Sequence, residues 1–328
     1  MIGIELTPEH PVDRIAALGE RAEAEGFDIA FASSHYNNRD SFVALDRIAR
    51  RTDSIRVGPG VANPFETHPV PLASRVATLD EASGGRAVFG IGAGDRSTLR
   101  NLGYEHERPL RRVLETVHVA RDLLAGERVD HDGTFVARDA GLNYEPPGDV
   151  PIYVGAQGPH MIRMAAKHAD GVLYNGSHPR DVEWAAGRVV EGLDDRPAHR
   201  GPFDFAVYAS VSIAEDADAA REAARPPVAF IAAGATDPVL ERHGIDADRA
   251  GAIGKHLSAG TFDAAFDAVS DAMLDAFCIA GTPETVAEKV DGVLEHADSV
   301  VAGAPLGPDL DEAVALTGAV LGDSTAAD

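Results

Sequence analysis

The chain has 328 residues, 45% of them hydrophobic, and 53 Asp and Glu against 29 Lys and Arg give it a net charge of −24. Nucleic acids and anionic membranes bind clustered positive charge, so this balance argues against both as partners. No run of 18 apolar residues is present, which argues against a transmembrane helix, and Cys278 is the only cysteine, which rules out a disulfide within the chain.

The charge also bears on the environment of the protein. Only three of the 29 basic residues are lysines. High net charge typifies disordered chains, but the apolar content is ordinary and periodic here, which indicates a folded protein. An acidic, lysine-poor surface suits molar salt, where the Debye length falls to about 3 Å. Because the first residues also lack the basic start of a signal peptide, we expect a cytoplasmic protein of a salt-loving microbe, with an ordinary acidic bacterial protein as the alternative.

Short apolar runs alternate with amphipathic helix patterns along the chain. The clearest helix is Pro109–Ala125, whose leucines and valines recur at three- and four-residue spacing. Eight alternating strands and helices predict an α/β fold with a parallel sheet closed into a (β/α)8 TIM barrel. A doubly wound open sheet is disfavoured, because no GxGxxG opens a helix after the first strand. The predicted strands are Ile2–Leu6, Asp28–Ser33, Ile55–Gly60, Ala87–Gly92, Ile152–Ala156, Gly171–Asn175, Asp204–Ile213 and Ser299–Gly303.

Two stretches exceed the strand–helix repeat. Residues 126–150 are predicted to be a surface excursion, and residues 226–297 a helical insertion that includes a helix at Ala264–Phe277. Thr282 followed by Pro283 predicts the start of a further helix. Neither stretch resembles a separate domain, so we expect one barrel domain over residues 1–328 with insertions at about 126–150 and 226–297. The second insertion is expected to cap the barrel or to make contacts in a homo-oligomer, a dimer or tetramer.

The carboxyl ends of the predicted strands carry the residues that a ligand would meet, because active sites of such barrels collect there. Four glycine-rich loops on one rim together indicate close backbone approach to a flat ligand, although for any single loop a tight turn is the better explanation. The 13 histidines are scattered without metal-binding spacing, so no metal site is expected. The candidate residues at these ends are Glu5, Ser34, His35, Gly60, Val61, Ala62, Asn63, Asp95, Gly155, Ala156, Gln157 and Gly158.

Segments at nearly every strand end resemble the F420-dependent methylenetetrahydromethanopterin reductases, members of the bacterial-luciferase-like superfamily. They follow the family's order from about residue 1 to residue 321 and read IGIEL, SHYNN, VGPGVANP, ATLDEASGGRAVFGIGAGD, PIYVGAQGP, VAFIAAG, ERHG and VAGAPLGPD. GPGVANP and VGAQGP together are specific, whereas GxGxGD alone is weak. The resemblance implies the luciferase-like TIM barrel, coenzyme F420 as cofactor, and hydride transfer to a reduced pterin C1 carrier, either methylenetetrahydromethanopterin or methylenetetrahydrofolate.

The resemblance also implies which carboxylates are catalytic. In the family reaction the ring that bridges N5 and N10 opens to an iminium ion, which requires a carboxylic acid that burial keeps partly protonated. Glu5 is the candidate, since strand alternation places it with Gly3 toward the barrel interior. A structural carboxylate paired with an arginine is the alternative. Asp95 matches the acid of the family's GPGD and is the second candidate, as a proton relay or a partner of the pterin; capping of the following helix fits it equally well.

Coenzyme contacts are expected in three loops. The N–H groups of Ala156, Gln157 and Gly158 precede a helix and suit the coenzyme phosphate, although Gln157 could instead reach the substrate. Ser34 and His35 stand where the family usually has Asp-His, so a hydrogen bond is retained there but a charge is lost. The family's counterpart of GPGVANP carries a non-prolyl cis bond behind the deazaflavin, so we expect the bond between Gly60 and Val61 to be cis, against the strong general preference for trans.

Two other functions remain open from the sequence. One keeps the barrel and replaces the cofactor, giving an FMN-dependent monooxygenase of the luciferase-like superfamily. The other is a non-catalytic barrel that binds a deazaflavin or a pterin as a carrier or sensor. The presence of Glu5 disfavours the second.

Overall fold

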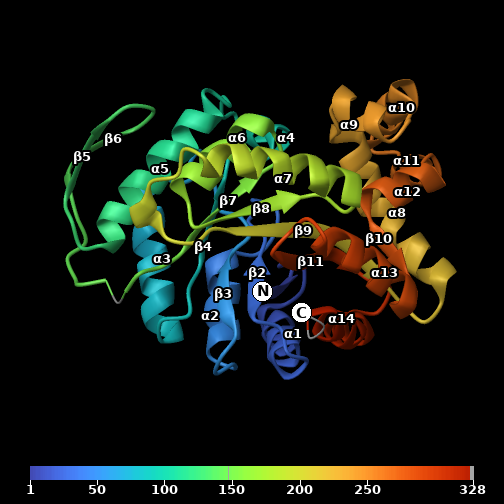
Figure 1. The fold of residues 1–328 in the computed structure, drawn as a ribbon, viewed down its shortest axis with the longest axis horizontal. Helices are drawn as coiled ribbons and strands as arrows, with labels where there is room; N and C mark the ends of the chain where they lie inside the picture. The colour runs from blue at the N-terminus through green and yellow to red at the C-terminus, as the bar shows by residue number, and fades with distance from the viewer. Residues whose placement is uncertain (147, 326–328) are drawn as a thin grey trace. The chain divides into compact units, whose positions relative to one another are not determined.

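The computed structural model describes residues 1–146 and 148–325, which form two compact units (Figure 1). Unit 1 comprises Met1–Tyr174 and Ala185–Ala206, and unit 2 comprises Asn175–Trp184 and the chain from Val207 onward. Helix α7 (Pro179–Leu193) contains the residues at which the chain passes from unit 2 back to unit 1. The two units are described separately below.

Unit 1 contains a parallel sheet whose strands follow one another in chain order. Its neighbouring strands pair in parallel, and the bridges Val57 to Ala87 and Ala62 to Ile91 connect the chain at its third and fourth strands. Parallel neighbours need a crossover between them, which the helices supply. The six predicted strands of this unit are confirmed: β1 (Ile2–Glu5), β2 (Ile29–Ala32), β3 (Arg56–Pro59), β4 (Phe89–Gly92), β7 (Ile152–Ala156) and β8 (Gly171–Asn175).

The helices of unit 1 begin and end where local chemistry directs. Helix α3 starts at Pro69 after His68, whose Nδ1 accepts a hydrogen bond from Val70 N, and stops at Gly84 in the left-handed conformation. The predicted helix at Pro109–Ala125 is confirmed and buries Val113 and Val117. The helices are α1 (Val12–Ala24), α2 (Ser41–Ala49), α3 (Pro69–Ser83), α4 (Arg96–Asn101), α5 (Pro109–Leu124) and α6 (Pro159–His168), with a 3₁₀ turn η1 (Ala198–Arg200).

A β-hairpin occupies part of the predicted surface excursion, where the sequence predicts no strand. Strands β5 (Val129–Asp132) and β6 (Val136–Ala140) pair in antiparallel fashion. Glu115 of α5, 5% exposed, accepts hydrogen bonds from Thr134 N and Oγ1 at 2.7 Å and from His131 Nε2 at 3.1 Å. The hairpin is therefore stabilised by hydrogen bonds to α5. The polar sequence of the hairpin itself gives no sign of this distant partner.

Unit 2 combines strands with a run of helices. Strand β9 (Asp204–Ile213) pairs in parallel with β10 (Ile279–Gly281) and is a sheet neighbour of β11 (Ser299–Leu306). The sequence predicts β9 and β11 but not the three-residue β10. The helices are α8 (Ala217–Gly234), α9 (Asp237–Arg242), α10 (Ala247–Ser258), α11 (Phe262–Asp267), α12 (Asp271–Phe277), α13 (Pro283–Leu294) and α14 (Leu310–Thr325).

The helical insertion differs from the prediction at two places. Its first helix begins at Ala217, earlier than the expected 226, and continues through Pro226 and Pro227. The single helix expected at Ala264–Phe277 is interrupted before Asp271, because Ser270 caps a new helix and accepts a hydrogen bond from Met273 N. The start of α13 after Thr282 is as predicted, with the Thr282 side chain as the N-cap.

Helices α8 to α12 of unit 2 lie close together (Figure 1). Their buried apolar side chains form a cluster of their own. Burial of this cluster explains why a run of short helices is stable without a sheet beside each one. Its larger members are Val228, Leu240, Ile253, Met273, Leu274 and Phe277.

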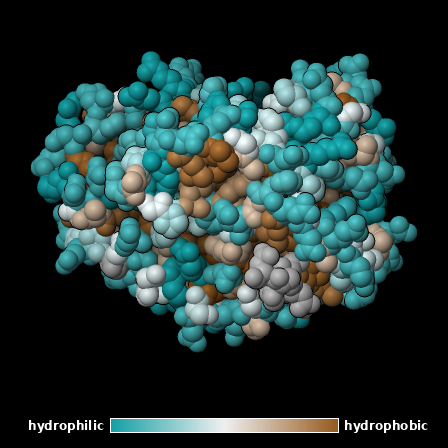
Figure 2. Space-filling model, viewed as in Figure 1, coloured by the Kyte–Doolittle hydropathy of each residue, from teal (hydrophilic) through white to brown (hydrophobic). Residues whose placement is uncertain are grey.

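Hydrophilic residues cover most of the face shown in Figure 2, with hydrophobic residues confined to smaller areas between them. Across the part of the chain that the structure describes, no helix combines the length and the apolar character needed to span a bilayer.

Candidate active site

The predicted site residues lie at the carboxyl ends of β1, β2, β3, β4 and β7 or on the loops that follow these strands, all in unit 1. Because these strands are parallel, their carboxyl ends meet at one edge of the sheet. The structure therefore brings the sequence-predicted residues to the same end of this unit.

Glu5 is the last residue of β1 and is 5% exposed. It lies opposite Phe31 of β2 in the parallel register, and its Oε1 accepts a hydrogen bond of 2.7 Å from Thr7 Oγ1. A carboxylate that is buried at a strand end, with a hydroxyl beside it, can hold a proton close to a bound ligand. Thr7 lies two residues after Glu5 in the chain, and the sequence reasoning did not single it out.

The loop after β2 carries one residue that the sequence reasoning missed. Ser34 is partly exposed and His35 is exposed, as a ligand contact requires. The preceding Ser33 is 9% exposed, and its Oγ makes no hydrogen bond with any described residue. A buried hydroxyl without a partner is uncommon in native proteins, and a ligand that supplies the partner would explain it. Its position directly after β2 and next to Ser34 could have identified Ser33 as a site residue from the sequence.

The loop after β3 has the expected backbone: the peptide bond between Gly60 and Val61 is cis. Val61 lies between two glycines, and a Cβ added to Gly92 would come within 2.6 Å of its Cγ2, while one added to Gly155 would come within 3.2 Å. The valine therefore occupies the space that side chains on β4 and β7 would otherwise take. Gly60 and Val61 remain partly exposed at this edge.

Asn63, expected to contact the coenzyme, uses its side chain within its own loop. Its Oδ1 accepts hydrogen bonds from Phe65 N and Glu66 N, and its Nδ2 donates to Glu66 Oε1 at 3.0 Å. Ala62 is bound through its backbone, with Ala62 N donating to Gly90 O at 3.0 Å. These contacts fix the loop, and they leave the backbone of residues 60 and 61 as its ligand-facing part.

The loop after β4 places Asp95 at the start of α4, where its Oδ1 accepts a hydrogen bond of 2.8 Å from Thr98 N. Helix capping, one of the two roles that the sequence allows, is therefore present, and the carboxylate is exposed. His106, which the sequence reasoning missed, steadies this loop: its Nε2 donates to Ala93 O at 2.9 Å and its ring packs on Phe65. A histidine far along the chain gives no local sign of such a contact.

The loop after β7 leads into α6 with Gly158 as the N-cap and without a side-chain capping bond. Gln157 and Gly158 are exposed, whereas Ala156 is 6% exposed. A helix N-terminus carries unpaired N–H groups and the positive end of the helix dipole. Because no side chain caps α6, its first backbone N–H groups are available to bind an anionic group.

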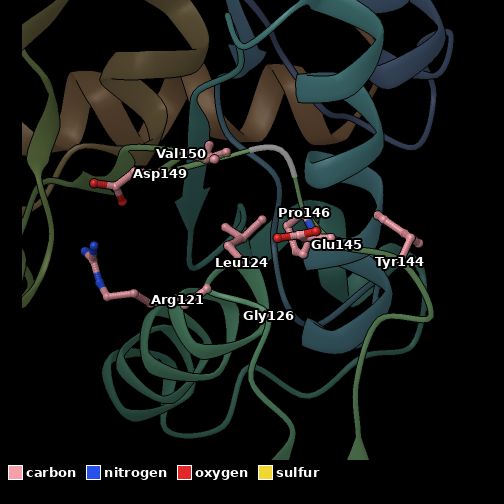
Figure 3. A pocket seen from close by; sticks show the side chains of 10 residues that line it. Arg121, Leu124, Gly126, Tyr144, Glu145, Pro146, Asp149 and Val150 are labelled. Atoms are coloured by element: carbon pink, nitrogen blue, oxygen red, sulfur yellow. The ribbon is translucent and has the colours of Figure 1, made fainter.

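A separate cavity of about 650 Å³ lies at the end of α5 and the start of β7 (Figure 3). Arg121, Tyr144 and Asp149 are among its lining residues. Because it adjoins the amino end of β7, it lies away from the strand ends that carry the candidate residues. Among the described residues, no three His, Cys, Asp or Glu side chains gather as a metal site.

Comparisons with known proteins cover nearly the whole chain. The sequence profile of the luciferase-like monooxygenase family matches residues 2–297. A 5,10-methylenetetrahydromethanopterin reductase of Archaeoglobus fulgidus is 42% identical over 322 residues, covering 96% of this chain and 97% of the relative. A reductase of the same name from Methanolobus tindarius is 42% identical over 320 residues, covering 96% of this chain and 98% of the relative.

Solved structures are similar to this chain over almost its full length as well. The coenzyme F420 dependent tetrahydromethanopterin reductase of Methanopyrus kandleri superposes with a TM-score of 0.90 at 38% identity, covering 97% of this chain and 96% of that one. An F420-dependent secondary alcohol dehydrogenase has a TM-score of 0.80 at 18% identity, covering 98% and 97%, and shares the fold.

Proposed function

The chain belongs to the luciferase-like monooxygenase family and, within it, to the 5,10-methylenetetrahydromethanopterin reductases, and we propose that it reduces the methylene group of a pterin C1 carrier with reduced coenzyme F420. The fold is accordingly the (β/α)8 TIM barrel of the luciferase-like type. The observation that carries the function is the similarity to these reductases over almost the full length of the chain. An F420-dependent hydride transfer is therefore the reaction of this protein.

The residues at the strand ends fit the coenzyme. The Ser33 hydroxyl, which has no partner among residues 1–146 and 148–325, offers a hydrogen bond to the deazaflavin edge. The adjacent Ser34, in place of the acid that the family usually has there, offers another. Gly60 and Val61 present backbone to the ring, and the exposed His35 follows β2, the strand that pairs with β3. Gly155, Ala156, Gln157 and Gly158, before the N-terminus of α6, suit the phosphate. When bound, the reduced coenzyme supplies the hydride.

Glu5 has the place that the proton-transfer step needs. It is buried at the end of β1 with the Thr7 hydroxyl beside it, and in the proposed reaction its carboxyl group passes a proton to N10, so that the bridging ring opens to the iminium ion. Asp95, exposed after β4 at the same edge of the sheet, relays a proton or binds the pterin while also capping α4. Gln157 is exposed and can orient either ligand.

The carrier is the part of the function that needs an assay. The relatives are named for methanopterin, which favours methylenetetrahydromethanopterin over methylenetetrahydrofolate. The test is steady-state oxidation of reduced F420 by each methylene carrier in molar KCl. We expect the methanopterin carrier to turn over at least about tenfold more efficiently, a difference of about 1.4 kcal/mol. Turnover with neither carrier, together with oxygen-dependent oxidation of reduced FMN, would instead identify a flavin monooxygenase.

Four further properties complete the proposal. The chain acts as one barrel domain over residues 1–328, it assembles into a homo-oligomer, a dimer or tetramer, and it works in the cytoplasm without binding nucleic acid. Light scattering on the purified protein measures the assembly. A monomer at micromolar concentration in molar KCl would contradict it.

A further inference from the structure

Three large hydrophobic side chains are exposed on two loops at the proposed active-site edge. Tyr36 follows β2 and is 49% exposed, and Leu102 and Tyr104, after α4, are 40% and 43% exposed. We call these three residues the tyrosine rim. Exposed aromatic side chains on loops at the carboxyl ends of barrel strands are positioned to meet a ligand rather than the core.

A hydrogen bond connects the loop after β2 with the end of α4. Asn101, at the end of α4, donates from Nδ2 to the hydroxyl of Tyr36 at 3.4 Å. Tyr104 is attached to the same helix end, because its N–H donates to Leu99 O at 2.9 Å after a turn at Gly103 with φ of 77°. Both tyrosines therefore border one end of α4 and are held there by separate contacts.

The other end of α4 carries Asp95, one of the two proposed catalytic carboxylates. Six residues at 1.5 Å per residue make α4 about 9 Å long. A pterin ring placed against Asp95 is too short to reach the tyrosine rim as well. A ligand that contacts both must extend along α4 beyond its pterin ring. The carrier meets this requirement, because its N10 bears an aryl group that extends away from the methylene bridge.

We propose that the tyrosine rim binds the aryl group on N10 of the carrier by stacking, an inference that rests on the proposed function. Aromatic stacking needs no charge on the ligand, which suits a protein of net charge −24 that would repel an anionic tail. The interaction is made equally with both carriers, so the rim contributes to affinity and not to the choice between them. It lies beyond the reacting atoms, so it acts on binding and not on the hydride step.

The test compares Tyr36→Ala and Tyr104→Ala with Tyr36→Phe, which keeps the ring and loses the hydroxyl bonded by Asn101. We expect each alanine variant to raise KM for the methylene carrier about tenfold, since stacking of one ring is worth about 1–3 kcal/mol, with kcat nearly unchanged. Tyr36→Phe should stay close to wild type. Tyr144→Ala is the matched control, because Tyr144 is 39% exposed but lies on the chain between β6 and β7.

Two binding measurements separate this inference from the proposed function. Calorimetry with tetrahydromethanopterin and with 6-methyltetrahydropterin, which lacks the aryl group, should show that the alanine variants lose affinity only for the first. Fluorescence titration with F420 should be unchanged. Equal loss for both pterins, or no loss for either, overturns the tyrosine rim as an aryl site. So does a change of oligomeric state with unchanged affinity, which would make it a contact between copies. Absence of turnover in the wild type with intact pterin affinity would overturn only the proposed reaction.

Discussion

Replacing Gly92 with alanine should destabilise the protein through one defined contact with Val61. A Cβ at this position lies 2.6 Å from Cγ2 of Val61, whereas carbon atoms in contact normally stay about 3.5–4.0 Å apart. Val61 is β-branched, so it has few alternative rotamers to turn into. Overpacking of this kind costs about 1–3 kcal/mol, and we expect a loss in that range in denaturant unfolding at fixed molar KCl.

A double-mutant cycle identifies the cause. Val61→Ala removes both Cγ atoms, so Gly92→Ala made in that background should cost at least about 1 kcal/mol less than in the wild type. Gly90→Ala is the contrasting variant, because its Cβ would lie 2.0 Å from the backbone oxygen of Pro59, which cannot rotate away. Its loss should exceed that of Gly92→Ala, and Val61→Ala should rescue it far less.

A helical glycine with free space is the control. A Cβ at Gly251 of α10 meets nothing within 4 Å, so Gly251→Ala should stabilise by up to about 1 kcal/mol through helix propensity. The reasoning is refuted by a Gly92→Ala loss below about 0.5 kcal/mol, or by strictly additive effects of Gly92→Ala and Val61→Ala. F420 titrations of the same variants report whether displacing Val61 also weakens coenzyme binding.

Three other predictions test the chemistry and the charge. Glu5→Gln should lower turnover by about 10²-fold while leaving F420 affinity intact; turnover within about threefold of wild type would remove Glu5 from the mechanism. Burial alone would raise the pKa of Glu115, but hydrogen bonds from Thr134, Arg111 and His131 lower it from 4.5 to about 2. Glu115→Gln should therefore cost up to about 3 kcal/mol of unfolding free energy near neutral pH, and the difference should shrink as pH falls from about 4.5 toward 2; a pH-independent difference would contradict this. The thermal midpoint should rise from low to molar KCl as screening relieves repulsion at −24; a flat or falling midpoint would contradict the halophile interpretation.

Eight of the strands and several of the helices of this protein can be predicted from its sequence, because their signals are local. A buried parallel strand such as Ile152–Ala156 consists of an apolar run that needs no distant partner to be recognised. The Thr282–Pro283 pair likewise starts α13 through its own capping bond. The carboxyl ends of the strands then indicate where ligand-binding residues lie, and the family resemblance adds what local physics cannot supply, including the coenzyme and the cis bond at Gly60.

Only the tertiary structure reveals contacts between residues far apart in the chain. The β5–β6 hairpin depends on Glu115, and the loop after β4 depends on His106, and neither partner is marked by its own neighbourhood. The Asn63 side chain forms its hydrogen bonds within its own loop, and the hydroxyl of Ser33 has no partner in the part of the chain that the structure describes. Which hydrogen bonds form depends on how segments far apart in the chain pack together and which donors and acceptors they bring within reach. An apolar sequence pattern therefore predicts the strands and helices that carry the site, but not the hydrogen bonds within it.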